Sequence, residues 1–265
     1  LGSGISIQPL WKPSQVFSSR TKAKLSVSGT VENPVIGLLG PETAGFQSSE
    51  LLDCPLHLSA INQVLHAVRE LIPKFGLVPY DVLSRQGELK GLILKSNEDG
   101  SQVILRFVLR TRTLLDSVRA AVLAVRARLP FVTVVSVNIQ PIPHAILEGP
   151  EEITQQEVIW EKMDGFSLAF APQSFSQVTH ETARALYGNI AERLSREPAT
   201  GLLDLYCGVG GFSFACAPYV EWSQGVEVSN QAIQCAELGR SRNQALQAEF
   251  TVGDAEEFVK KYRGK

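Results

Sequence analysis

The strongest constraint on the fold is a regular alternation of short apolar runs and helical stretches after residue 200. Strands are expected at 202–206, 222–228 and 250–252, and a helical stretch follows each of them. Parallel strands need a crossover between them, so this alternation predicts right-handed βαβ units and a parallel sheet. A doubly wound sheet has about six strands. The pattern therefore predicts the first half of such a sheet.

A glycine-rich turn, DLYCGVGGF at residues 204–212, links the first of these strands to a helix. Glycines let the backbone bend sharply and approach a ligand closely, and the first helical turn offers unpaired N–H groups. A dinucleotide-binding turn reads G-x-G-x-x-G, but the last position here is Ser213, so that match is incomplete. The alternative is a tight turn without a ligand.

Three acidic residues lie near the carboxyl ends of the expected strands. Asp204 beside the turn suits a cationic ligand without phosphate, such as the amino-acid end of S-adenosylmethionine, and would repel a pyrophosphate. Glu227 can accept hydrogen bonds from two ribose hydroxyls in either cofactor class. Asp254 is placed to meet an adenine amino group. Each acid can instead be solvated or cap the next helix. The pattern favours S-adenosylmethionine over NAD, which leaves a dehydrogenase as a lower-ranked alternative.

Before residue 165 the expected helices and strands follow a different order. The expected elements up to the glycine-rich turn are a strand at 24–31, a helix at 59–72, a hairpin of strands at 89–95 and 103–109, a helix at 114–129, strands at 131–139, 145–149 and 166–170, and a helix at 179–194. Ser59 or Asn62 is expected to cap the first helix, and Pro73 with Gly76 to end it. The antiparallel pairs indicate an α+β domain.

Composition bounds the setting of the protein. The chain is 44% hydrophobic and 20% charged, which is typical of a globular protein and excludes a disordered chain or a rod. No apolar run approaches the ~18–20 residues of a membrane span, and no secretion leader is seen. Four scattered cysteines do not make a disulfide scaffold. We therefore expect a cytoplasmic monomer. Because the chain starts at Leu1 and its only methionine is Met163, we also expect it to be trimmed.

Several short stretches occur in a characteristic order along the chain. They lie at 22–24, 27–29, 54–56, 87–90, 105–110, 137–141, 148–149, 172–175 with Gln177, and 204–212. As an ordered set they resemble the uracil-C5 RNA methyltransferases, above all the bacterial branch that makes 5-methyluridine in large-subunit rRNA. The resemblance implies an α+β central, RNA-contacting domain at 1–165 and the amino-terminal half of a Rossmann-like methyltransferase domain at 166–265.

The resemblance also implies a reaction. A cysteine thiolate attacks the carbon next to C5 of uracil, C5 takes the methyl group of S-adenosylmethionine, and a base then removes the C5 proton. The uracil must leave its stack to reach the pocket. The family's cysteine and base lie in the second half of the sheet, so no catalytic residue is expected before Lys265. Cys207 lies inside the cofactor turn and is not expected to replace the nucleophile.

The family's binding residues carry over to several positions. The cofactor-binding residues implied are Gln177, Asp204, Tyr206, Gly208 and Gly210, with Glu227 on the ribose. At 175–179 the chain reads FSQVT where the family has Phe-Phe-Gln-x-Asn, a departure close to Gln177. Cys54 corresponds to the last of four ligands of a [4Fe–4S] cluster. The other three ligands are not in this chain, so a cluster is implied only for an intact protein.

RNA contact must rest on local patches, because the net charge is −2. Residues 101–130 hold one acid and six arginines: Arg106, Arg110, Arg112, Arg119, Arg126 and Arg128. These could follow phosphates, or they could form a solvated helix face and hairpin edge. Lys22 and Lys24 lie in a stretch that resembles the family and are the preferred RNA contacts. The alternatives to an rRNA enzyme are a tRNA or small-molecule methyltransferase and a non-catalytic RNA-binding module.

Overall fold

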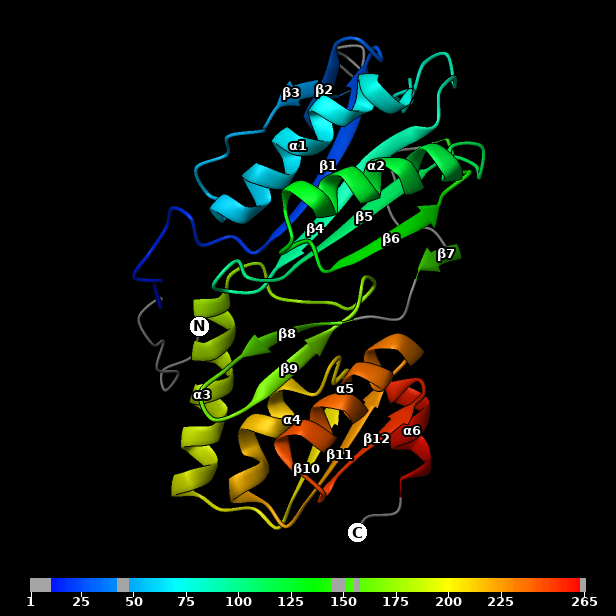
Figure 1. Cartoon of the computed structure of the whole chain (residues 1–265). Coiled ribbons are helices and arrows are strands. Elements are labelled where there is room, and N and C mark those ends of the chain that lie inside the picture. Colours follow the sequence, from blue (N-terminus) through cyan, green and yellow to red (C-terminus); the bar gives the residue numbers. More distant parts are fainter. Residues whose placement is uncertain (1–10, 42–47, 144–150, 155–157, 263–265) are drawn as a thin grey trace.

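A seven-stranded sheet dominates the first part of the chain (Figure 1). The computed structural model describes residues 11–41, 48–143, 151–154 and 158–262. The strands are β1 (Lys22–Gly29), β2 (Pro34–Leu39), β3 (Ser48–Glu50), β4 (Leu89–Ser96), β5 (Val103–Leu109), β6 (Val134–Ile139) and β7 (Glu151–Thr154), in the order β3-β2-β1-β4-β5-β6-β7. The strand expected at 145–149 lies outside the described residues.

The expected hairpin is confirmed, since β4 and β5 pair antiparallel with Leu92 opposite Phe107. All neighbouring pairs in this sheet are antiparallel except β5 and β6, which pair parallel. Helix α2 (Leu115–Arg128) lies between β5 and β6 in the chain. It returns the chain to the end of the sheet at which β5 begins, so that β6 can run in the same direction as β5. A parallel pair requires such a crossover, so the antiparallel pattern expected for this region is interrupted by one βαβ unit.

Helices α1 (Ser59–Phe75) and α2 cover one face of the sheet (Figure 1). Side chains of a strand alternate between its two faces. In β1, Ala23, Leu25 and Val27 are buried in the core with α1, so Lys22 and Lys24 point to the other face. The sheet therefore has an apolar face under the helices and a face that carries polar and basic residues.

The ends of α1 differ in detail from expectation. Its N-cap is Leu58, and neither Ser59 nor Asn62 caps the helix. The Asn62 side chain instead donates a hydrogen bond to the Cys54 carbonyl. The helix also continues through Pro73, because a proline in the last turn removes only one helical hydrogen bond. Gly76 ends it in the left-handed conformation, where glycine has no steric penalty.

The second part of the chain contains the expected parallel sheet, in the order β10-β11-β12 (Figure 1). Its elements and the two-stranded sheet before it are β8 (Ile159–Lys162), β9 (Ser167–Phe170), α3 (His180–Arg196), β10 (Gly201–Leu205), α4 (Gly211–Cys216), the 3-10 turn Ala217–Tyr219, β11 (Trp222–Glu227), α5 (Asn230–Asn243), β12 (Ala248–Val252) and α6 (Ala255–Lys261). Within the described ranges, no helix has the length and apolar character needed to span a bilayer.

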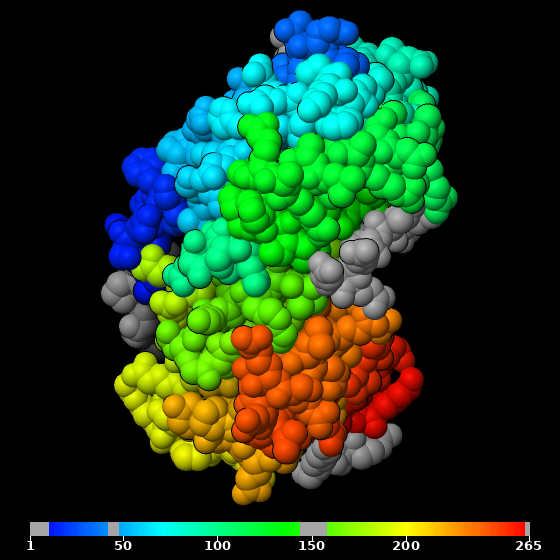
Figure 2. Space-filling view, viewed as in Figure 1, coloured from blue at the N-terminus to red at the C-terminus, as the bar shows by residue number. Residues whose placement is uncertain are grey.

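The two parts share a packed junction. Ile104 of β5 and Val134 of β6 lie in the same buried cluster as Ile159 and Leu168, which belong to the β8–β9 pair. The small sheet therefore packs against the face of the large sheet that α1 and α2 leave uncovered. In the space-filling view the blue-to-green first part of the chain lies against the yellow-green segment below it, and that segment in turn lies against the orange part (Figure 2).

Candidate cofactor site

The glycine-rich turn lies where β10 meets α4, at the carboxyl edge of the parallel sheet. Tyr206, Gly208 and Gly210 all have positive φ, at 61°, 55° and 86°. A positive φ is costly for a residue with a Cβ, and such strain gathers at ligand-binding turns. Tyr206 is 72% exposed, so this backbone conformation does not force its ring into the core. The turn therefore presents an aromatic ring to the solvent.

The two glycines with positive φ serve different purposes. A Cβ added at Gly208 would have no atom within 4 Å, so open space lies beside that position. A Cβ at Gly210 would come within 2.9 Å of the rings of Phe214 and Phe250. Those two rings pack edge to face, with centroids 5.6 Å apart. Gly210 therefore allows the core to close under the turn, while Gly208 leaves room on its outer side.

Asp204 is buried below the turn and is bound to the first turn of α4. Its Oδ2 atom accepts hydrogen bonds from the Ser213 backbone N–H at 3.1 Å and from the Ser213 hydroxyl at 2.8 Å. Burial raises the pKa of Asp204, and the two bonds from Ser213 oppose that shift. Both bonds use one carboxylate oxygen, so the other oxygen stays outside this contact.

Glu227 joins two of the βα turns. One of its oxygens accepts a hydrogen bond from the Gly208 N–H, and the other accepts one from the Ser229 N–H at 2.9 Å. Ser229 itself caps α5 by accepting a hydrogen bond from the Ala232 N–H. The carboxylate that was expected to face a ribose therefore also holds the glycine-rich turn against the end of β11.

Asp254 and Gln177 lie at two further edges of the site. Asp254 caps α6 by accepting a hydrogen bond from the Glu257 N–H at 2.9 Å, which is the alternative that the sequence left open for it. Gln177 is exposed in the segment between β9 and α3. The same segment is fixed to α5, because the Gln173 N–H donates to the Gln231 side chain at 2.8 Å.

The thiols near the turn are poor nucleophiles. Burial, with Asp204 and Glu227 nearby, raises the pKa of Cys207 far above its ordinary value. Burial also raises the pKa of Cys216 to about 11 and raises the pKa of Cys235. A thiol must lose its proton to attack, so we assign no nucleophile to these three residues.

Cys54 lies in the loop before α1 and is partly exposed. Its carbonyl accepts hydrogen bonds from the Asn62 side chain and the His57 N–H, which fold the loop around it. In the part of the chain that the structure describes, no group of three or more His, Cys, Asp or Glu residues could hold a metal ion. These residues do not fit an iron–sulfur site.

The expected arginine patch divides into separate contacts. Arg106 is only 2% exposed, so it cannot follow phosphates, and its inclusion in a surface patch was wrong. Arg110 pairs with Glu88, and Arg128 pairs with Glu70. Lys24, by contrast, is exposed on the sheet face opposite the helices. Strand alternation places Arg106 on the face opposite Leu105 and Phe107, but it could not show that this face is covered at that point.

Comparison with known proteins identifies the family. The family model described as tRNA (Uracil-5-)-methyltransferase matches residues 133–265. The 23S rRNA (uracil(747)-C(5))-methyltransferase RlmC of Edwardsiella ictaluri (strain 93-146) is 40% identical over 250 residues, which are 94% of this chain and 66% of that protein. RlmC of Escherichia coli O157:H7 is 36% identical over 253 residues, or 95% of this chain and 66% of that protein. The chain thus spans 66% of the length of these curated relatives.

A solved structure has the same fold. The crystal structure of Pyrococcus abyssi tRNA (uracil-54, C5)-methyltransferase in complex with S-adenosyl-L-homocysteine superposes with a TM-score of 0.73 at 19% identity. The superposition covers 91% of this chain and 57% of the Pyrococcus abyssi chain. The expected fold, a Rossmann-like methyltransferase sheet preceded by an α+β region, is therefore confirmed. Because the family model covers half of the chain and the relatives agree with it, the chain belongs to the tRNA (uracil-5-)-methyltransferase family.

Proposed function

We propose that this chain is part of an enzyme that transfers a methyl group from S-adenosylmethionine to C5 of a uridine in RNA, with 23S rRNA as the substrate. The observation that carries the proposal is the turn after β10, where Gly208 leaves open space and Glu227 closes the other side. The identity to RlmC proteins supports rRNA over tRNA and over a small molecule. We further propose a division into domains at 1–165 and 166–265.

Within this proposal, each residue of the turn has a task. The second oxygen of Asp204 attracts the ammonium group of the cofactor, and the Tyr206 ring covers the cofactor from the solvent side. The open space beside Gly208 lets the cofactor approach the backbone of the turn, while Gln177 closes the site from the segment before α3. Glu227 accepts from the ribose hydroxyls, and Asp254 meets the adenine from the end of β12. When bound, S-adenosylmethionine supplies an electrophilic methyl group.

RNA is proposed to lie on the sheet face that carries Lys22 and Lys24. That face is opposite α1 and α2 and continues toward the junction with the second part of the chain. Lysines there can neutralise phosphates without reading sequence. We expect a monomer in the cytosol, a reducing compartment that fits the four free cysteines. A [4Fe–4S] cluster is not proposed on the described residues.

Two experiments test the function in sequence. Calorimetric titration of the chain with S-adenosylhomocysteine, and separately with NAD, tests the cofactor class; binding of NAD alone would overturn the proposal. The enzyme of which this chain is proposed to be part is then incubated with methyl-labelled S-adenosylmethionine and transcripts of 23S rRNA or tRNA, and the RNA is digested for mass spectrometry. We expect 5-methyluridine in the rRNA transcript. Methylation of tRNA alone would instead select the tRNA alternative.

A further inference from the structure

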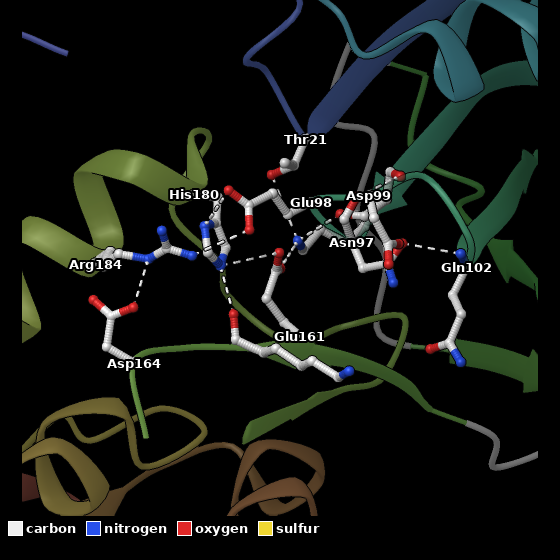
Figure 3. A network of polar contacts seen from close by, with 12 residues as sticks. Thr21, Asn97, Glu98, Asp99, Gln102, Glu161, Asp164, His180 and Arg184 are labelled. Carbon is white, nitrogen blue, oxygen red and sulfur yellow. Dashed lines mark hydrogen bonds and ion pairs between the residues drawn. The ribbon is translucent and has the colours of Figure 1, made fainter. Parts of the chain in front are cut away.

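A buried set of charged side chains joins the large sheet to the start of α3 (Figure 3). Lys95 of β4 and Glu161 of β8 form an ion pair in which the side chains are only 7% and 3% exposed. The Lys95 ammonium also donates to the Ser96 carbonyl at 2.7 Å. Burial lowers the pKa of Lys95, and Glu161 opposes that shift. Buried charges are costly unless they are closely paired, so this contact holds the two parts in one arrangement.

His180, the first residue of α3, extends this set. Its Nε2 atom lies 2.8 Å from the Lys162 carbonyl oxygen and 3.7 Å from a Glu161 carboxylate oxygen. Its Nδ1 atom lies 3.0 Å from a Glu98 carboxylate oxygen. A carbonyl and an ionised carboxylate can only accept hydrogen bonds. Nε2 is thus within hydrogen-bond distance of a carbonyl, whereas Nδ1 makes no hydrogen bond among the described residues and lies at ion-pair distance from Glu98. A buried ring between two carboxylates in this way favours a doubly protonated, positively charged imidazole.

The charges around His180 balance one another. Glu161 Oε1 is buried and accepts no hydrogen bond within the described residues, so a positive charge at His180 compensates it. Arg184, one turn further along α3, pairs with Glu98 at 3.2 Å and with Asp164 at 3.3 Å. The charged groups that face His180 from the surrounding elements are Lys95, Glu98, Glu161 and Arg184. A cavity of about 450 Å³ lined in part by Glu98, His180 and Arg184 lies at this junction.

The start of α3 is connected to the candidate cofactor site in two ways. Gln177 lies three residues before His180, and the intervening Val178 carbonyl accepts a hydrogen bond from the Thr21 N–H at 2.8 Å. On the other side, Tyr187 packs so closely on Gly211 that a Cβ there would be 2.4 Å from its ring. The position of His180 thus sets both the Gln177 segment and the helix that follows the glycine-rich turn.

We propose that doubly protonated His180 is a positioning residue for the cofactor site, held by Glu98 and Glu161. The proposal rests on the proposed function, because it concerns the affinity for S-adenosylmethionine. Loss of one proton leaves two carboxylates facing a neutral ring, so His180 loses its ion pairs with Glu98 and Glu161. Gln177 and the turn at Gly211 then lose their fixed relation, and cofactor affinity falls.

The test compares variants on the same helix. His180→Gln keeps a hydrogen-bond donor but removes the charge of the ring. Glu98→Gln removes the charge of the carboxylate that faces His180 Nδ1. Because Glu98 is half-exposed, we expect this variant to fold. Glu192→Gln is the matched control, since it breaks an exposed pair with Arg196 on α3 away from the junction. Binding of S-adenosylhomocysteine is measured at about pH 6 and about pH 8.5, a range that spans ordinary histidine titration. Circular dichroism confirms that each variant is folded.

We expect wild-type affinity to be about fivefold or more higher at the lower pH, a normal size for coupling between sites. The Glu98→Gln and His180→Gln variants bind more weakly at low pH and have a flatter pH profile, while Glu192→Gln behaves as wild type. ¹⁵N NMR of the His180 ring should show protons on both nitrogens at about pH 6. Wild-type affinity in both variants, or a singly protonated ring, would overturn the positioning role. No binding by the wild type would instead overturn the proposed function.

Discussion

Glu227 at the end of β11 accepts a hydrogen bond from the backbone N–H of Gly208 at 3.2 Å. The glycine-rich turn is thus held by a residue from the neighbouring strand. Hydrogen bonds from N–H groups to a carboxylate are stronger than those between neutral groups. A residue expected only to bind ribose therefore also shapes the turn that would receive the cofactor.

Glu227→Gln should weaken both the turn and the site. The new amide has one accepting oxygen, so either the Gly208 or the Ser229 N–H loses its acceptor, which costs about 1–3 kcal/mol when the group is buried. We expect a loss in unfolding free energy at the lower end of that range and about tenfold weaker S-adenosylhomocysteine binding. Glu221→Gln, at the exposed amino end of β11, is the control. Equal effects of both changes would contradict the role of Glu227.

Gly208→Ala and Gly210→Ala should differ in how they act. At Gly208 only the positive φ is unfavourable, at a cost of about 1–2 kcal/mol. At Gly210 the new methyl group also meets Phe214 and Phe250, and overpacking adds about 1–3 kcal/mol. Urea denaturation should show the larger loss for Gly210→Ala. A larger loss at Gly208 would mean that the packing under the turn is not as described.

Asp204→Asn should flatten the pH dependence of stability. Because burial raises its pKa, folded Asp204 binds more protons than unfolded Asp204. Its contribution to stability is therefore present below the unfolded pKa, about 3.9, and is lost as pH rises through the folded pKa. Asparagine can still accept from Ser213 but does not titrate. Relative to the variant, wild-type unfolding free energy should fall from about pH 4 to about pH 7; a relative rise would be the wrong sign.

Lys24→Ala should weaken RNA binding, and Lys74→Ala should not. Lys24 is exposed on the sheet face opposite the helices. Lys74 lies in the last turn of α1, on the helix side of the sheet and away from the proposed RNA face. Loss of one phosphate contact should reduce the slope of log K against log salt by about 1. Filter binding of a 23S rRNA transcript at several salt concentrations measures this. Matching slopes for the two variants would place the RNA elsewhere.

Cysteine modification should be selective. Cys54 is partly exposed, whereas Cys207, Cys216 and Cys235 are buried and burial raises the pKa of each. Thiolates react with iodoacetamide and thiols do not, so the native protein should be labelled at Cys54 first. Peptide mass spectrometry after a short reaction identifies the labelled residue. Early labelling of Cys207 would show an open turn and revive it as a candidate nucleophile.

Much of the fold could be predicted because it depends on local patterns. The hairpin of β4 and β5, the helices α1 and α2, and the three βα units after residue 200 follow from apolar periodicity, turn residues and the need for crossovers between parallel strands. The glycines and acids of the turn could be named for the same reason, since strand ends meet at one edge of a parallel sheet.

The remaining features depend on which distant segments meet. The parallel pairing of β5 with β6 and the burial of Arg106 require knowledge of the whole sheet and of what covers its second face. Lys95, Glu161 and His180 are each ordinary polar residues in the sequence, separated by many positions. Only the packing of β8 and α3 against β4 brings them within contact distance. The helices, the strands and the residues of the glycine-rich turn could be predicted from the sequence, because they depend on neighbours in the chain. The tertiary structure decided which charges are buried together, because burial depends on contacts between segments far apart in the chain.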